Sequence, residues 1–312
     1  MKKRLLFLIV VCIKQLNIFA QNEISLLSAK AKIALIKDDT TLALKYYLAE
    51  IDLNPSKPFD YLTAVKYLDE TNDYINLDKV VRKLLAIGYP IQEIDSKVSS
   101  NFKNSNQWNS IQKSKDSIVE NYNKSLNKNW LNELGKMTFS DQEIRQVYMK
   151  SFKDTVRKEK LLFSMNIIDS INFDHLLATT KLYGFPNYKT VGYSGVNDVW
   201  ILLWHHRGKE FEVNPLWKEI MPFIEKEISV GNLDKDFLTM FIDDNEIANG
   251  RPMVYGTLYG YFRGLPEFDQ YEVIEPKDIN LRRKQVGLAP IDLWLEALKL
   301  PLPEKLKGIS LN

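Results

Sequence analysis

Apolar residues recur at every third or fourth position along most of the chain, a spacing that gathers them on one face of an α-helix. Between residues 23 and 90 this pattern forms two units of the same design. Each unit has a polar turn in its middle, at Asp39 in the first and at Asp73 in the second, 34 residues later. Each ends at a proline, Pro55 or Pro90, and these prolines are 35 residues apart. The chain is therefore expected to begin with two helical hairpins.

A period of 34 or 35 residues is that of tetratricopeptide helix pairs, which this segment resembles in part. Ala43, Tyr47 and Pro55 match the small residue, the aromatic residue and the helix stop of such a repeat. Glu50 and Leu77 stand where the repeat has small residues. Because a free-standing solenoid needs about three repeats, we expect a degenerate, tetratricopeptide-like pair that packs against the rest of the chain. Generic helical hairpins are the alternative.

A polar stretch rich in Asn, Ser and Lys follows at residues 91–136. It predicts one or two peripheral helices that join the two halves of the chain. The expected domains are accordingly a tetratricopeptide-like helical domain with a polar connecting segment at 21–130, and a second domain at 131–312.

The second half carries five further helical patterns and one change of period. Ser140 or Asp141 is expected to cap the first of these helices, with Glu143 in its first turn. The other four lie at 172–184, 191–206, 214–231 and 234–250. The segment "VYGTLYGYF" (254–262) then alternates with a period of two, and with "QYEVIE" (270–275) it predicts a β-hairpin. Two short helices close the chain, so the expected fold class is mainly α (α+β) with one small β-hairpin.

The first twenty residues have a different character. Lys2, Lys3 and Arg4 precede an apolar run from Leu5 to Ile13, and Ala20 supplies a small residue for cleavage. This is the pattern of a secretory signal peptide, and the apolar run is far shorter than the ~20 residues that span a bilayer. We expect residues 1–20 to be removed and the protein to be periplasmic or secreted from a bacterium, with no membrane span after cleavage.

Composition excludes several classes of chemistry. The only cysteine, Cys12, lies within the expected signal peptide, so the mature chain has neither disulfides nor a thiol nucleophile nor cysteine-ligated zinc. The 42 basic and 40 acidic residues nearly cancel, which predicts no nucleic-acid partner. A protein partner that binds the N-terminal helical repeats remains the expected interaction.

Two of the three histidines, His205 and His206, are adjacent at the polar end of an apolar run. Neighbours on a helix diverge by about 100° and cannot chelate one metal ion as an i, i+4 pair does. With His175 as the remaining histidine, we expect no metal site and no cofactor. His206 is expected to be an exposed residue at the helix end.

The catalytic candidates are His205 as a general base, Asp243 as the acceptor that orients it, and Tyr255 as a second donor. A buried histidine with a purely structural hydrogen bond is the competing interpretation of His205.

Three further residues near these are candidates for ligand binding. Thr257 offers a binding hydroxyl, and Arg282 with Arg283 can clamp an anion. A salt bridge that pins the C-terminal helix to the Asp243 turn explains the two arginines equally well.

Short motifs occur in a characteristic order in the second half. They are Gly184-Phe185-Pro186, Val191-Gly192, Trp200 to His205, Ile242 to Asn245, Tyr255-Gly256-Thr257, and Asn280 to Pro290. Over roughly residues 138–298 this set resembles a bacterial family of domains of unknown function, the DUF6624 family. The resemblance makes His205 the histidine of the family pattern. Trp204, Asp244, Met253 and Leu258 stand where that pattern has Gln, Arg and the two Gln that flank the YGT motif. It implies a fold and no activity, and it implies that this chain has lost part of any site formed by those polar residues.

Two functions follow from these features. The favoured one is an exported, non-catalytic binding or interaction protein, whose helical repeats present a groove to a protein partner. The alternative is a periplasmic enzyme, of hydrolase type, with a site made of His205, Asp243 and Tyr255.

Overall fold

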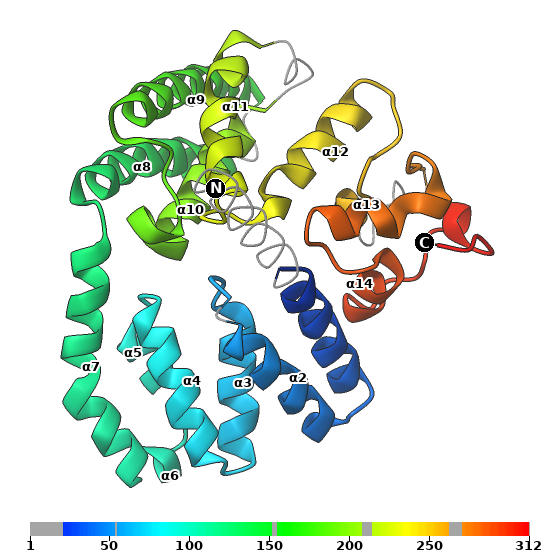
Figure 1. The fold of residues 1–312 in the computed structure, drawn as a ribbon. Coiled ribbons are helices and arrows are strands. Elements are labelled where there is room, and N and C mark those ends of the chain that lie inside the picture. Colours follow the sequence, from blue (N-terminus) through cyan, green and yellow to red (C-terminus); the bar gives the residue numbers. More distant parts are fainter. Residues whose placement is uncertain (1–20, 54, 152–154, 208–213, 262–269, 312) are drawn as a thin grey trace, which may run out of the picture. The chain divides into compact units, whose positions relative to one another are not determined.

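The computed structural model describes residues 21–53, 55–151, 155–207, 214–261 and 270–311, and the chain forms two compact units (Figure 1). The described residues up to Ser125, with Asp234–Ile247 and those from Arg251 onward, form unit 1; Leu126–Leu233 and Ala248–Gly250 form unit 2. The second expected domain, 131–312, is thus divided between the units. The expected signal peptide lies outside the described residues.

Unit 1 begins with a series of helices. Residues 21–36 are helical and are followed by α2 (Thr40–Asp52), α3 (Phe59–Glu70), α4 (Tyr74–Ala86), α5 (Ile91–Asp95), α6 (Ser100–Lys103) and α7 (Asn106–Ser125). Helix α3 packs against α2 and α4, and α4 packs against α7 (Figure 1). The side chains of Asp39 and Asp73 cap α2 and α4 by accepting from backbone N–H groups. The residue before each cap, Asp38 or Asn72, is in the left-handed region at φ 58° or 59°.

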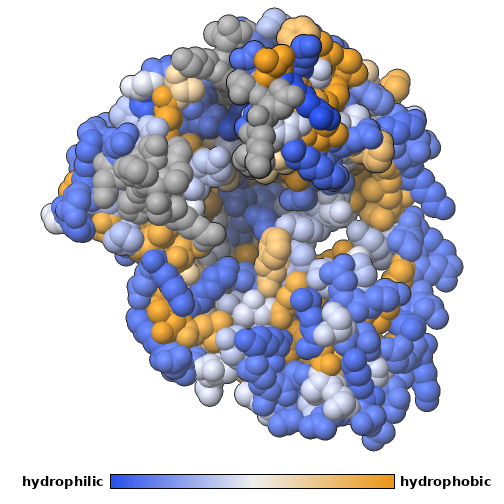
Figure 2. Space-filling model, turned by 180° about the vertical axis from the view of Figure 1, so that it is seen from behind, coloured by the Kyte–Doolittle hydropathy of each residue, from blue (hydrophilic) through white to orange (hydrophobic). Residues whose placement is uncertain are grey.

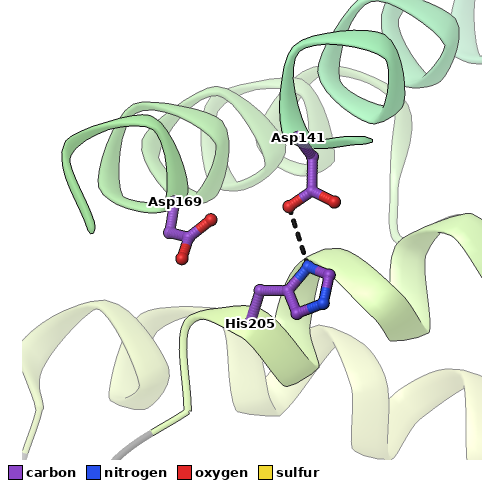
Figure 3. Close-up of side chains that lie close together, drawn as sticks. All are labelled: Asp141, Asp169 and His205. Carbon is purple, nitrogen blue, oxygen red and sulfur yellow. Dashed lines mark hydrogen bonds and ion pairs between the residues drawn. The ribbon is translucent and has the colours of Figure 1, made fainter. Parts of the chain in front are cut away.

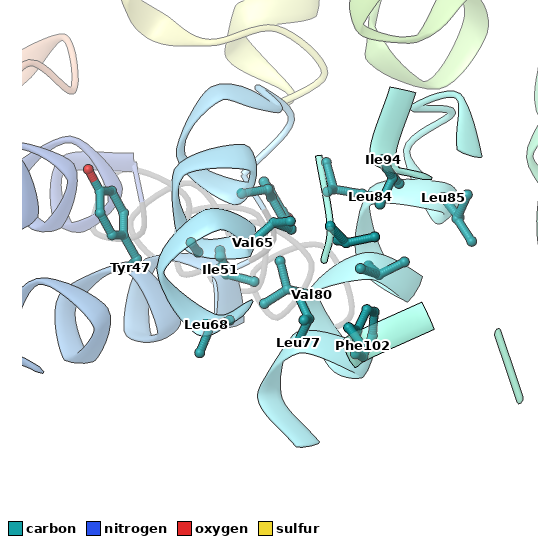
Figure 4. Packing of buried hydrophobic residues seen from close by; sticks show 14 of the residues in the cluster. Tyr47, Ile51, Val65, Leu68, Leu77, Val80, Leu84, Leu85, Ile94 and Phe102 are labelled. Carbon is teal, nitrogen blue, oxygen red and sulfur yellow. The ribbon is translucent and has the colours of Figure 1, made fainter. Parts of the chain in front are cut away.

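One apolar core joins these helices. Figure 4 shows its residues meeting between α2, α3, α4 and the short helices that follow. Ile51, Leu68, Leu77, Val80 and Phe102 are all completely buried. Full burial of such a side chain contributes about 1.5–3 kcal/mol, so this core is the main source of stability of the N-terminal part.

A polar cluster lies beside this core. Glu50 of α2 is only 2% exposed. Its neighbour Asp60 of α3 accepts from the Ser28 hydroxyl at 2.6 Å and pairs with the Lys32 ammonium at 3.1 Å. Burial, and then the charge and the hydrogen bond of Asp60, raise the pKa of Glu50 to about 9. Glu50 therefore carries a proton at neutral pH.

The C-terminal part of unit 1 consists of short helices. They are η1 (Lys235–Leu238), α12 (Thr239–Ala248), η2 (Thr257–Tyr259), η4 (Pro276–Asp278), α13 (Ile279–Gln285), α14 (Ile291–Ala297) and η5 (Glu304–Leu306). Contacts with the first helical segment tie this part to the N-terminal helices. The Ala289 N–H donates to the Ser25 hydroxyl at 2.7 Å, and the Lys235 N–H donates to Gln21 at 3.0 Å.

The expected β-hairpin at 254–275 is wrong. The described part of this segment contains no strand, only an isolated parallel bridge between Met253 and Val273. Gly256 adopts φ 66°, which turns the chain into a 3₁₀ turn at Thr257–Tyr259. The amides that a strand would pair are bound by the Asp243 carboxylate. Residues 262–269, the expected turn, lie outside the described residues.

Unit 2 is a group of four helices: α8 (Lys128–Lys150), α9 (Thr155–Tyr183), α10 (Tyr188–His205) and α11 (Pro215–Ser229). Helix α9 packs against α8, α10 and α11, and α10 also packs against α8 (Figure 1). Asn127 caps α8 by accepting from the Trp130 N–H. The expectation that Ser140 or Asp141 caps a helix is therefore wrong, since both lie inside α8.

The fold class expected from the apolar periodicity, mainly α, is confirmed. None of the helices in the described ranges combines the length and the apolar character that a bilayer span requires. On the face drawn in Figure 2, hydrophobic residues lie in small groups among hydrophilic ones.

Candidate functional site

His205 is the last residue of α10, and its ring meets a carboxylate from α8. The Nδ1 atom of His205 lies 2.8 Å from Oδ1 of Asp141 (Figure 3). The Asp141 side chain is 1% exposed and that of His205 is 21% exposed. A carboxylate can only accept, so Nδ1 carries the proton of this hydrogen bond and Nε2 of the neutral ring is an acceptor. Among the described residues, Nε2 has no hydrogen-bond partner.

The Asp141 carboxylate is held from its own helix. Gln142 donates to its Oδ2 at 2.7 Å, and Nη1 of Arg145 donates to its Oδ1 at 2.7 Å. Arg145 follows Asp141 by four residues, so the two side chains lie on the same face of α8. Both carboxylate oxygens are engaged, which fixes the orientation in which Asp141 meets His205.

Arg145 also binds a second carboxylate, which comes from α9. Its Nη2 donates to both oxygens of Asp169, at 2.8 and 2.9 Å. Burial raises the pKa of Asp169, and the paired Arg145 guanidinium opposes this shift. One guanidinium thus joins two buried carboxylates. We call Asp141, Arg145, Asp169 and His205 the Asp141 network.

Three members of this network have the donors of a metal site. One ligand atom from each of Asp141, Asp169 and His205 lies within 4.8 Å of the others. Such a set of two carboxylates and one imidazole suits a divalent transition metal. The Arg145 guanidinium already binds both carboxylates, however, so a metal ion would share them with a fixed positive charge. The network therefore fits proton chemistry better than metal binding.

His206 has a different environment. Its ring lies against Phe173 at a centroid distance of 4.3 Å, and Phe173 in turn contacts Trp217 at 5.2 Å. Burial lowers the pKa of His206, opposed by the charges of Asp169 and Asp174. The expectation that His206 is an exposed residue at the helix end is wrong, because the ring fills an aromatic cluster.

Asp243 lies in unit 1 and is completely buried. It accepts from the backbone N–H groups of Val254, Tyr255 and Thr257 at 2.7, 2.9 and 2.7 Å. The Thr257 hydroxyl donates to it as well, at 2.7 Å. Burial raises the pKa of Asp243, and these hydrogen bonds oppose the shift. The expected role of Asp243 as the acceptor for His205 is filled instead by Asp141, because both Asp243 oxygens bind the 254–257 segment.

The two candidate arginines bind backbone carbonyls of the same region. Arg282 donates from Nε to the Val254 carbonyl at 2.9 Å. Arg283 is completely buried and donates to the carbonyls of Ala289 and Tyr255 at 2.6 and 2.7 Å. Burial lowers the pKa of Arg283 to about 10. In place of the expected anion clamp or salt bridge, these contacts anchor the loop that Asp243 binds through its amides.

Tyr255 is half-buried, and burial, with the charge of Asp243, raises its pKa. It lies with Asp243, Thr257, Arg282 and Arg283 in unit 1, whereas His205 belongs to unit 2. The structure thus brings five of the six candidates together, in a network that shapes a loop. The partners that it gives to His205 are residues absent from the candidate set.

Asp141, Arg145 and Asp169 were missed by the reasoning from sequence. One signal for Asp141 is present in its helix. The buried residues of α8 are Trp130, Leu134, Met137 and Asp141, at spacings of four, three and four. An aspartate at the next position of an apolar stripe needs a buried partner.

These features define a mainly helical protein with a buried carboxylate, arginine and histidine network in one unit and a carboxylate-anchored loop in the other. The family of unknown function DUF6624 matches residues 128–307, more than half of the chain, and the protein belongs to this family. The matched segment contains both networks. Comparisons with curated proteins and with solved structures found no match.

Proposed function

We propose that the protein is an exported enzyme of hydrolase type, in which His205 is the general base. One observation carries the proposal: a buried carboxylate holds Nδ1 of His205, while Nε2 is unpaired among the described residues on a partly exposed ring. This arrangement sets the tautomer of the imidazole and leaves its basic nitrogen available for a substrate or a water molecule.

The charges of the network suit a histidine that gains and loses a proton. With Asp141 and Asp169 ionised and Arg145 cationic, the three fixed groups carry a net charge of −1. An imidazolium at His205, formed during a reaction, would neutralise this charge. In a hydrolysis, Nε2 would take the proton of the attacking water and then return it to the leaving group. Asp141 would stabilise the intermediate imidazolium.

A second candidate function is binding without catalysis, and the N-terminal helices support it. The left-handed residues Asp38 and Asn72, each followed by a capping aspartate, recur at the 34-residue period of the sequence. Equivalent turns at this spacing favour tetratricopeptide-like repeats, which commonly present a groove to a protein partner. An exported protein with such repeats would recruit a protein to the family domain.

The decisive test is the tautomer of His205 in the mature chain, residues 21–312. Nitrogen-15 NMR should show neutral His205 protonated at Nδ1, and Asp141→Asn should abolish that preference. His175 is the matched control, since its Nε2 pairs with Glu133 at 2.8 Å on a more exposed surface. Neutral His205 protonated at Nε2 would refute the general-base assignment.

Turnover is then measured on ester, phosphate-ester and glycoside substrates. His205→Gln should lower the rate by about 10²–10⁴-fold, the usual contribution of a positioned acid or base. His175→Gln should leave the rate unchanged. An equal loss of turnover rate in both variants, or a rate that His205→Gln leaves unchanged, would show that His205 is not the general base of the reaction. The export proposal is tested separately by the intact mass of the protein recovered from the periplasm, which should equal that of a chain beginning at Gln21.

A further inference from the structure

The outer face of α9 carries a row of exposed apolar residues. Val156, Phe163, Ile167 and Ile171 are 64%, 68%, 45% and 60% exposed. Their spacings of seven, four and four place them on one face of a helix. We call these four residues the α9 stripe. A typical exposed helix face is polar, so a stripe of this length predicts a partner surface.

The opposite face of α9 is already occupied. Asp169, Asn172, Phe173 and Leu176 are buried there, and α9 packs against α8, α10 and α11. The stripe is therefore not the face by which α9 joins its own unit.

We propose that the α9 stripe is a self-association surface, on which α9 of a second copy packs antiparallel about a two-fold axis at Ile167. A two-fold axis places each residue before Ile167 opposite the residue equally far after it. Phe163 then faces Ile171 of the other copy, because each is four residues from the axis. Seven residues from the axis, Lys160 faces Asp174, and both are exposed.

Charge selects the antiparallel arrangement. In a parallel pair in the same register, Lys160 would face Lys160 and Asp174 would face Asp174, which is repulsive at both ends. In the antiparallel pair each lysine meets an aspartate, twice in the dimer. The dipoles of the two helices also point in opposite directions, which favours the antiparallel pair. Farther out, Val156 faces Ala178, an exposed small residue that leaves room for it.

The contact is long and narrow. From residue 156 to residue 178 the helix extends about 33 Å at about 1.5 Å per residue. A single pair of helices buries an area at the low end for stable interfaces, so we expect a dissociation constant in the micromolar range.

Sedimentation of the mature chain from about 1 to about 200 µM should show a monomer–dimer equilibrium. Lys160→Glu and Asp174→Lys should each weaken the dimer by about tenfold or more, by placing like charges opposite each other. The double variant reverses both charges and should restore dimerisation to near the original constant. Circular dichroism confirms that each variant is folded.

Position 167 gives an independent geometric test, because the mature chain has no cysteine. Ile167→Cys should form a disulfide-linked dimer in mild oxidant, since the two copies of this residue meet at the axis. Ile75→Cys, which is 77% exposed on α4, is the collisional control and should cross-link far more slowly. A monomer at every concentration overturns the proposal, and so does a dimer that neither charge reversal weakens.

Discussion

Replacing Glu50 with glutamine is expected to stabilise the protein by an amount that grows with pH. Burial raises the pKa of Glu50 from 4.5 to about 9, and the charge and hydrogen bond of neighbouring Asp60 contribute in the same direction. The Lys32 ammonium opposes them without cancelling them. The folded protein therefore keeps a proton on Glu50 that the unfolded chain releases.

The sign and the size follow from this difference. Below pH 4.5 the carboxyl is protonated in both states and costs nothing. Between pH 4.5 and about 9, each pH unit favours the unfolded state by about 1.4 kcal/mol. At pH 7 the accumulated cost is about 3 kcal/mol, on the order of a quarter or more of the stability of a typical domain. Glutamine does not titrate, and its amide can still donate to Asp60.

The assay is urea denaturation of residues 21–312 at several pH values between 5 and 8. The gain from Glu50→Gln should be small at pH 5 and should reach about 3 kcal/mol near pH 7. Glu120→Gln is the control, because Glu120 is 64% exposed on α7 and should change stability by less than about 0.5 kcal/mol at every pH. A gain that does not depend on pH, or a loss at all pH values, would refute the assignment of a buried proton to Glu50.

Three further outcomes are expected in the same denaturation assay. Asp243→Asn should lower the free energy of unfolding by about 3 kcal/mol, because the –NH₂ of the new amide would face backbone N–H donors. Asp116→Asn, at an exposed position of α7, should leave it almost unchanged. Gly256→Ala should lower the free energy of unfolding by about 2 kcal/mol or more, since φ is +66° and the added carbon would lie 2.7 Å from a neighbouring side chain. Gly135→Ala, at a position of α8 where an added carbon meets no other atom, should instead raise it by about 0.5–1 kcal/mol. Arg145→Lys should cost about 2 kcal/mol, because an ammonium cannot bind both oxygens of one carboxylate while also reaching the other; an unchanged stability would mean that the bridging geometry contributes little.

Most of the helices could be predicted from the sequence, because their apolar residues repeat at the helical period over ten residues or more. The segment at 254–262 could not be predicted in this way. Its alternation of tyrosine with glycine and leucine is that of a strand. Its conformation is decided by Asp243, which binds three of its amides from more than ten residues away, and by the left-handed Gly256. Local pattern carries no information on such a contact.

The candidate site shows the same limit. His205 is recognisable by its position at the end of an apolar run, but the sequence alone predicts Asp243 as its partner, where the structure has Asp141. The sequence predicts a helix cap at Ser140 or Asp141, because Ser-Asp followed by Glu is also a capping pattern. The observed helix α8 begins earlier than the expected helix, at Lys128. In this longer helix Asp141 lies on the same buried face as Leu134 and Met137. Recognising a polar residue within an apolar stripe requires the helix boundaries first.

The Arg145 bridge has a consequence for the specificity of the fold of unit 2. Apolar side chains tolerate small displacements of one helix along another, since one methyl contact resembles the next. A guanidinium that binds Asp141 of its own helix and both oxygens of Asp169 on α9 does not tolerate such a displacement. Sliding α9 by a single residue would separate Asp169 from Arg145 and leave a buried carboxylate without its partner, an error that costs several kcal/mol. His205 adds the same constraint for α10, so one polar node sets the register of three helices whose apolar faces alone would permit several.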